Sequence, residues 1–175
     1  MRMATRQTIR ILGIDPALRC TGYGVIDTDG RNYKALDCGV ITTPPKRPLS
    51  ECLTRLNRGI RELLDSFEPD VTAIEGGFFA KNAKTAMILG SARGAVIAPV
   101  AEAGVTIYEY APRRIKQAIC GHGNASKEQI ANLVKQMLAL TNQKIRSDAT
   151  DALAIAICHA NTCFTNQGVF LPEPI

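Results

Sequence analysis

The strongest constraint on the fold is a pair of short, mainly apolar segments that each end in an acidic residue. The first is residues 8–15 (TIRILGID) and the second is residues 71–75 (VTAIE), so Asp15 and Glu75 close the two segments. Apolar segments of this length are typical of buried β-strands, since helices need more residues. In sheets flanked by helices, ligands bind at the carboxyl ends of the strands. We therefore expect both acids at one edge of a buried sheet, where a functional site would lie.

The rest of the first half of the chain predicts a hairpin and a helix. A turn over residues 16–22 leads into a strand that begins at Tyr23, and Asp29-Gly30 marks a hairpin to a third strand near residues 33–42. Apolar residues at steps of three and four then predict an amphipathic helix over residues 49–67.

The second half of the chain predicts mainly helices. The expected elements are a helix over 82–103, a strand over 105–110, a short helix after Pro112, a helix over 127–140 and a last helix to about residue 161. Ser126 and Gln129 predict a capping box, and Ser147 is expected to cap the last helix. Together the segments predict the α/β class, with a central mixed five-stranded sheet flanked by helices.

The length of 175 residues fits one domain with a proper core. We expect residues 1–7 to be an N-terminal extension, residues 8–162 to form the domain and residues 163–175 to be a mobile tail. No stretch approaches the ~20 consecutive apolar residues of a membrane span, and the basic N-terminus lacks the apolar region of a secretory signal. The sequence thus predicts a cytoplasmic protein with no membrane partner.

The net charge of +5 is unevenly distributed along the chain. Residues 81–147 carry ten Lys and Arg against three Glu, whereas the remainder is slightly acidic. Clustered positive charge favours a polyanionic partner, because basic side chains displace counterions from phosphates. Nucleic acid is therefore a candidate partner, and a basic surface that merely faces solvent is the alternative.

The six cysteines form no C-x-x-C pair and are irregularly spaced, at positions 20, 38, 52, 120, 158 and 163. Disulfide frameworks belong to small secreted chains, so we expect free thiols that pack as small apolar residues. Cys158, His159 and Cys163 could be considered as metal ligands, but a complete tetrahedral set is not visible.

Four acids form the candidate catalytic and metal-binding set: Asp15, Glu75, Asp148 and Asp151. Asp148 and Asp151 are three residues apart and so share one face of the last helix. Converging carboxylates without matched cations repel one another, and hard divalent cations such as Mg²⁺ or Mn²⁺ relieve that repulsion. Two such ions support phosphodiester cleavage. The alternative is that Asp148 and Asp151 only favour the helix dipole and that Asp15 only starts a turn.

The chain carries a series of short motifs: Gly13-Ile14-Asp15-Pro16, Thr21-Gly22-Tyr23-Gly24, Ala73-Ile74-Glu75, Phe78-Phe79-Ala80-Lys81-Asn82, Leu89-Gly90-Ser91-Ala92-Arg93-Gly94 and Asp148-Ala149-Thr150-Asp151-Ala152-Leu153-Ala154-Ile155-Ala156. In their order and spacing over residues 8–161, these motifs closely resemble those of the RuvC-type Holliday junction resolvases. One departure is Ala17, at a position where the family commonly has Gly.

The resemblance implies an RNase H-like fold and a homodimer that resolves four-way DNA junctions by two symmetric nicks during recombination and repair. It implies two Mg²⁺ ions, replaceable by Mn²⁺, on Asp15, Glu75, Asp148 and Asp151. Phe78 matches an aromatic residue that packs on bases near the junction centre, and Lys116 and Lys127 match DNA-contacting lysines. The implied products carry 5′-phosphate and 3′-hydroxyl ends, and the implied partners are the branch-migration proteins RuvA and RuvB.

Three other functions are weighed against this one. Sugar kinases and actin also begin with a Gly-Ile-Asp strand, but 175 residues cannot supply their second lobe, and no Walker A motif is present. A junction-binding protein without catalytic activity would gain nothing from acids that face phosphates. A nuclease of the same fold that acts on RNA–DNA hybrids or linear DNA is not separated by fold alone.

Overall fold

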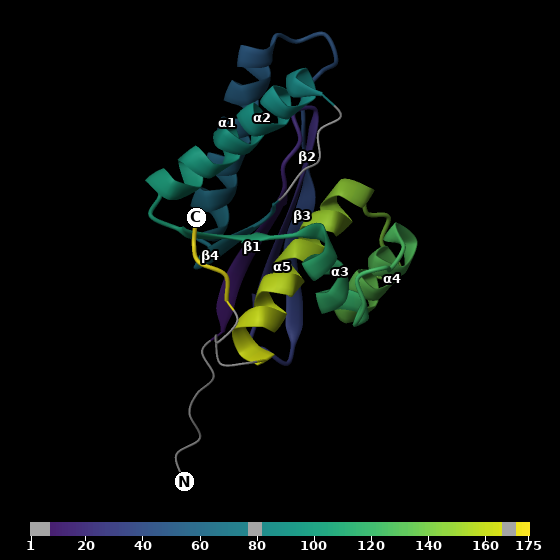
Figure 1. Ribbon diagram of the computed structural model, residues 1–175. Helices are drawn as coiled ribbons and strands as arrows, with labels where there is room; N and C mark the ends of the chain where they lie inside the picture. The colour runs from purple at the N-terminus through teal and green to yellow at the C-terminus, as the bar shows by residue number, and fades with distance from the viewer. Residues whose placement is uncertain (1–7, 77–81, 166–170) are drawn as a thin grey trace.

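A computed structural model describes residues 8–76, 82–165 and 171–175. The expected extension at residues 1–7 lies outside this part of the chain. The described residues form one five-stranded sheet in the order β3-β2-β1-β4-β5 (Figure 1). Its strands are β1 (Ile9–Asp15), β2 (Cys20–Thr28), β3 (Tyr33–Thr42), β4 (Val71–Glu75) and β5 (Thr106–Tyr110). The β1–β2 and β2–β3 pairs are antiparallel and the β1–β4 and β4–β5 pairs are parallel, so the predicted mixed sheet is confirmed.

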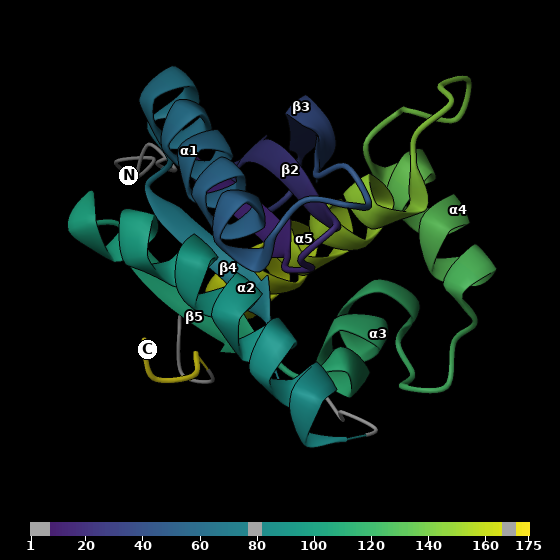
Figure 2. The ribbon, with the colours of Figure 1, turned by 90° about the horizontal axis from the view of Figure 1, so that it is seen from above.

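Helices cover both faces of the sheet (Figures 1 and 2). One face carries α1 (Leu49–Phe67) and α2 (Ala83–Glu102), and the other carries α3 (Pro112–Cys120), α4 (Lys127–Met137) and α5 (Ser147–Thr165). Of the helices that the structure describes, none combines the length and apolarity needed to cross a membrane.

Two boundaries differ from the sequence-based expectation near the first hairpin and in α4. The strand β2 begins at Cys20 rather than at Tyr23, because Gly22 already pairs with Asp15 across the sheet. The capping box of Ser126 and Gln129 is confirmed. However, α4 ends at Met137 rather than at residue 140, and Ala139 takes a left-handed conformation with φ of 54°.

The last helix is also longer than predicted. Ser147 is its first residue rather than its cap, and the carbonyl of Arg146 accepts the amide hydrogen of Thr150 at 3.1 Å. The helix continues to Thr165, past the expected end near residue 161. At the end of the chain, the amide of Ile175 donates to the carbonyl of Ile107 on β5 at 3.0 Å. The mobility of residues 163–175 and the domain boundary at residue 162 stay predictions.

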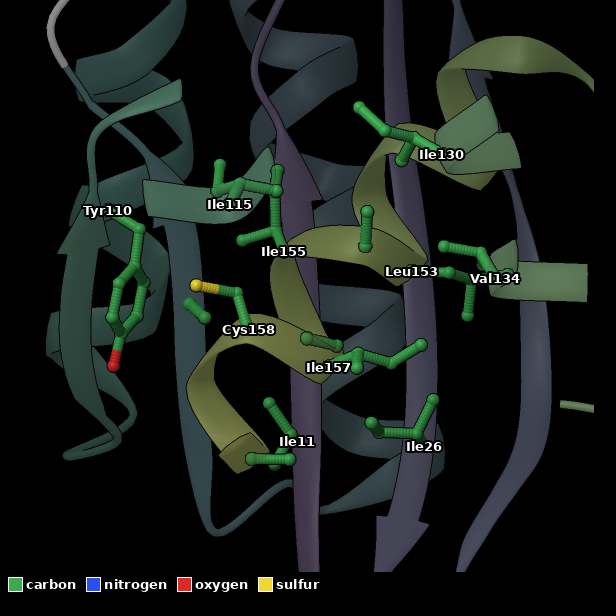
Figure 3. Close-up of a cluster of buried hydrophobic side chains, with 14 of the residues drawn as sticks. Ile11, Ile26, Tyr110, Ile115, Ile130, Val134, Leu153, Ile155, Ile157 and Cys158 are labelled. Carbon is green, nitrogen blue, oxygen red and sulfur yellow. The ribbon is translucent and has the colours of Figure 1, made fainter. Parts of the chain in front are cut away.

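The period-2 alternation of the strands divides the core into two clusters. On β1, Ile11 contacts the cluster that contains α3, α4 and α5, whereas Leu12 and Ile14 contact the cluster that contains α1 and α2. Figure 3 shows the first cluster, in which Ile11 and Ile26 of the sheet lie beside the apolar side chains of α5. By the same alternation, the side chain of Asp15 lies on the α5 face of the sheet.

Glycines on β1 and β2 let α5 lie directly on the sheet. Gly13 pairs with Gly24, and Gly22 pairs with Asp15. A Cβ atom on Gly13 would lie 2.1 Å from the carbonyl oxygen of Ala152, and one on Gly22 would lie 1.9 Å from that of Asp148. These contacts leave no room for a side chain, so the first turns of α5 come close to the end of β1.

We expect Gly13→Ala to destabilise the protein, because the new methyl group would push α5 away from the sheet. Overpacking of this kind costs about 1–3 kcal/mol of unfolding free energy. The control is Ser66→Ala on the exposed side of α1, away from the contact between α5 and the sheet. There the higher helix propensity of Ala should stabilise the protein by less than about 1 kcal/mol. Urea unfolding followed by circular dichroism measures both, and equal stabilities of the two variants would contradict the close contact.

Candidate active site

Asp15 and Glu75 are neighbours at the carboxyl ends of two parallel strands. They are the last residues of β1 and β4, and the preceding residues Ile14 and Ile74 pair in register. Gly13 and Ala73 lie on the α5 side of the sheet, so two residues further on both acidic side chains lie on that side as well. Both carboxyl groups line the same recess, and the charge of Asp15 contributes, after burial, to the raised pKa of Glu75. The sequence-based expectation that both acids meet at one sheet edge is therefore confirmed.

Asp151, on the first turns of α5, completes a group of three acids around a small recess. The recess has a volume of about 110 Å³ and is lined by Asp15, Glu75 and Asp151 together with Lys116, Lys127 and an apolar wall that includes Ile115 and Ile130. Lys127 Nζ lies 3.3 Å from Asp151 Oδ2. The recess therefore combines carboxylates with lysines.

Asp148 is not among the residues that line the recess. Its Oδ2 atom lies 3.6 Å from a guanidinium nitrogen of Arg146, and the same nitrogen donates to Cys20 Sγ at 3.2 Å. Its charge still raises the pKa of Asp15, so Asp148 belongs to the same electrostatic environment. The structure thus brings three of the four predicted acids together and turns the fourth toward an arginine at the rim.

The recess holds unfavourable negative charge. Burial, followed by the charge of Asp151, raises the pKa of Asp15 to about 6. Burial, followed by the charge of Asp15, raises the pKa of Glu75 to about 7. Lys127 opposes both shifts, and its own pKa is raised by the charge of Asp151. Lys127 therefore does not fully offset the effects of burial and of neighbouring negative charge on the two carboxyl groups.

The donor chemistry of this recess fits a hard divalent cation. Carboxylate oxygens are the ligands that Mg²⁺ and Mn²⁺ prefer, and a cation would relieve the repulsion that raises both pKa values. Within residues 8–76, 82–165 and 171–175, no three His, Cys, Asp or Glu side chains are already drawn together as a metal site. Binding one ion with all three carboxylates would therefore require them to move toward one another.

The predicted DNA-contacting residues have different outcomes. Lys116 on α3 and Lys127 on α4 both line the recess, so these two helices bring positive charge to the acids. Phe78 lies outside the described residues. A much larger groove of about 1030 Å³ runs between β3 and α1, but none of the sequence-predicted site residues lines it.

Sequence reasoning missed the charged side chains behind and beside the recess. Arg93 of α2 forms an ion pair with Glu109 of β5 and donates a hydrogen bond to the backbone carbonyl of Glu75. Arg146 pairs with Asp148. Arg93 belongs to a motif quoted for the family resemblance, which was the available signal. Arg146 stands two residues before Asp148, a spacing that by itself does not predict an ion pair.

The cysteines and His159 are structural, as expected. All six cysteines are free, and Cys52 and Cys158 are buried. His159 is buried, with Nδ1 2.8 Å from the Tyr110 hydroxyl and Nε2 3.1 Å from Cys163 Sγ. Burial lowers the pKa of His159 to about 4 and raises the pKa of Cys163 to about 11. The thiol and imidazole therefore stay neutral, which disfavours nucleophilic catalysis by this pair.

The recess is lined by acids at the ends of β1 and β4, an acid on α5 and two lysines. This set of side chains fits a hard cation and a phosphate-bearing ligand, a combination found in nucleases. The chain belongs to the RuvC family, whose model, described as crossover junction endodeoxyribonuclease RuvC, matches residues 11–159. A crossover junction endodeoxyribonuclease RuvC of Chloroflexus aggregans is 43% identical over 159 residues, which are 91% of this chain and 97% of the relative. The corresponding protein of Vibrio parahaemolyticus is 49% identical over 152 residues, 87% of each chain.

Solved structures agree with this assignment. RuvC of Thermus thermophilus in complex with Holliday junction substrate is similar with a TM-score of 0.86 and 36% sequence identity, covering 95% of this chain and 99% of that one. The yeast mitochondrial Holliday junction resolvase Ydc2 is similar in fold alone, with a TM-score of 0.66, 13% identity and coverage of 91% and 82%. The RNase H-like fold expected from the sequence is thereby confirmed.

The raised pKa values of Asp15 and Glu75 predict how stability depends on pH without divalent metal. Between the ordinary pKa values of free carboxyls and the raised values of about 6 and 7, the folded state binds more protons than the unfolded state. Stability should therefore fall as pH rises through this window. Glu75→Gln removes one charge, and we expect it to raise the unfolding free energy by about 1–2 kcal/mol near pH 8 but not near pH 4.

Chemical unfolding in a chelator at both pH values measures this effect, and Glu62→Gln on the exposed side of α1 is the control. A Glu75→Gln variant that is equally stable or less stable than the wild type near pH 8 would contradict the crowding of the acids.

Proposed function

We propose that the chain is a structure-selective endodeoxyribonuclease that resolves four-way DNA junctions. It makes paired symmetric nicks during recombination and repair and leaves 5′-phosphate and 3′-hydroxyl ends. The observation that carries this proposal is the gathering of Asp15, Glu75 and Asp151 with Lys116 and Lys127 in one recess, in a chain of the RuvC family. The Thermus thermophilus relative is described in complex with a Holliday junction substrate, which supports the choice of substrate.

In this proposal the four acids Asp15, Glu75, Asp148 and Asp151 hold two divalent ions, Mg²⁺ with Mn²⁺ as a substitute. When bound, the ions supply Lewis acidity that activates water and stabilises the leaving 3′-oxygen. Asp15 would hold the ions together with its neighbours, because it shares the recess with Glu75 and Asp151 and the charges of Asp151 and Asp148 act on it. Asp148 would join the set by leaving Arg146. The two charged groups are 3.6 Å apart and partly exposed, so solvent screens their attraction.

The remaining polar side chains prepare the recess for a phosphate. Lys127 lies against Asp151 and Lys116 lies on the opposite wall from α3, so both can offer an ammonium group to a backbone phosphate. Positive charge beside the acids is needed because the carboxylates by themselves would repel DNA. Phe78 is proposed to pack on bases near the junction centre, as the family resemblance implies. The apolar wall formed by Ile115 and Ile130 limits the access of water to the acids.

We also propose a homodimer, because paired symmetric nicks need two sites related by symmetry. The outer side of α2 supports this: a Cβ atom on Gly90 or Gly94 would meet nothing within 4 Å, and Met87 nearby is 73% exposed. A second helix could approach this smooth face closely. RuvA and RuvB are the partners that the family resemblance implies, and the cytoplasm is the proposed location.

The function is tested with a labelled mobile four-way junction, with and without Mg²⁺, beside a linear duplex. The wild type should nick the junction symmetrically only with metal and should spare the duplex. Asp15→Asn should lower the cleavage rate by more than about 100-fold, because it removes a carboxylate ligand, while junction binding persists. Asp65→Asn, on the exposed side of α1, is the control.

The other outcomes separate the alternatives. A wild type that binds the junction but does not cut it with Mg²⁺ or Mn²⁺ would favour a non-catalytic binding protein. Equal cutting of the linear duplex would overturn the substrate assignment, and normal cleavage by Asp15→Asn would overturn the metal ligands.

Sedimentation at micromolar concentration tests the dimer. The wild type should sediment at twice the chain mass of 18.9 kDa. Gly94→Arg should sediment as a folded monomer, because Arg fits a helix but its bulk and charge prevent close approach of a second helix. Gln136→Arg on α4 adds the same charge on the other face of the sheet and should remain dimeric. A monomeric wild type would contradict the proposal.

A further inference from the structure

Arg93 reaches from α2 to the end of the strand that carries Glu75. Its side chain is only 17% exposed. One guanidinium nitrogen donates to the backbone carbonyl oxygen of Glu75 at 3.1 Å, and the other forms an ion pair with Glu109 of β5. A single side chain therefore ties a helix to two neighbouring strands at the edge where the acids lie.

The backbone after Glu75 is held on the same side. The amide of Gly76 donates to the carbonyl of Tyr110 at 2.9 Å, which extends the β4–β5 pairing by one step. A Cβ atom on Gly76 would lie 1.8 Å from Glu109 Oε1, so the side chain of Glu109 lies directly against this glycine. Arg93, Glu109 and Gly76 thus enclose the end of β4.

This enclosure lies on the opposite side of the sheet from the recess. Ile107, two residues before Glu109, packs with α1 and α2, whereas Tyr110 packs with α5. Arg93 and Glu109 therefore contact Glu75 from behind, through its backbone, while the Glu75 carboxyl lies among the other acids. From this position Arg93 cannot contact DNA in the recess.

The restraint matters because Glu75 is crowded by like charge and β4 is only five residues long. Repulsion from Asp15 and Asp151 favours any movement that takes the Glu75 carboxyl out of the recess. A hydrogen bond from a buried guanidinium to the carbonyl of the same residue opposes such movement. Groups that orient ligand-bearing residues in this way typically contribute about 10–100-fold to metal affinity or activity.

We infer that Arg93, held by Glu109, is a positioning residue that keeps the Glu75 carboxyl aimed into the recess. The inference rests on the proposed function, in which Glu75 is a ligand of the divalent ions. It adds α2 and β5, which contribute no predicted site residue, to the machinery of the reaction.

The test compares Arg93→Gln, Arg93→Lys and Glu109→Gln with the wild type. The measurements are Mn²⁺ affinity without DNA, by electron paramagnetic resonance, and single-turnover cleavage and binding of a four-way junction. Arg93→Gln should lower Mn²⁺ affinity and cleavage rate by about 10-fold or more while junction affinity is unchanged. The Mn²⁺ affinity and cleavage rate of Arg93→Lys and Glu109→Gln should lie between those of the wild type and those of Arg93→Gln, because each variant retains part of the contact.

The control is Arg61→Gln, which removes the ion pair between Arg61 of α1 and Glu102 of α2, with side chains 46% and 65% exposed. It breaks a bond to the same helix far from the acids and should leave all three measurements unchanged. Thermal melting shows which variants are folded. If Arg93→Gln is poorly folded, Arg93→Lys, which keeps the positive charge, takes its place in the comparison.

Loss of melting temperature with unchanged Mn²⁺ affinity and cleavage rate in the folded Arg93 variants would overturn the inference, since Arg93 would then be a structural tether only. A wild type that fails to cut junctions would instead overturn the proposed function. In that case the Mn²⁺ affinities would still decide whether Arg93 positions Glu75.

Discussion

The close contact between α5 and the paired strands β1 and β2 is the constraint on which the rest of the structure depends. Because Gly13 and Gly22 have no side chains, backbone carbonyls of α5 pack directly against the sheet. A side chain at either position would displace the helix. The buried residues of α3 and α4 pack in the same cluster as α5, and those helices carry Lys116 and Lys127. The packing of α5 on these two glycines therefore determines where both the acids and the lysines lie.

That contact comes at an electrostatic cost, which the chain offsets in part. Burial, together with the charges gathered at the ends of β1 and β4, raises the pKa of Asp15 and Glu75. A protein without a use for crowded acids would gain stability by replacing them. Lys127 reduces the repulsion among the acids by pairing with Asp151. Arg93 holds the backbone of Glu75 from the other side of the sheet. Such stored repulsion is typical of functional sites, where a ligand relieves it.

Local patterns predicted most elements because their causes are local. The capping box of Ser126 and Gln129 depends on residues three apart, and the amphipathic α1 depends on its own periodicity. The errors arose where backbone pairing, which leaves no pattern in the side chains, decides the boundary. β2 begins early because Gly22 pairs with Asp15, and Ser147 is helical because the carbonyl of Arg146 accepts the hydrogen bond expected of the serine.

The sequence by itself predicted that Asp15 and Glu75 end buried strands and meet at one edge of the sheet, because short apolar segments can be recognised from neighbouring residues. Family motifs singled out Asp148 and Asp151 as well. Only the tertiary structure decided that Asp151 lines the recess while Asp148 turns to Arg146, and that Arg93 joins Glu109 and Glu75. The contacts of Asp151 and Arg93 depend on how helices and strands pack, and packing brings together charges whose separation along the chain leaves no local pattern.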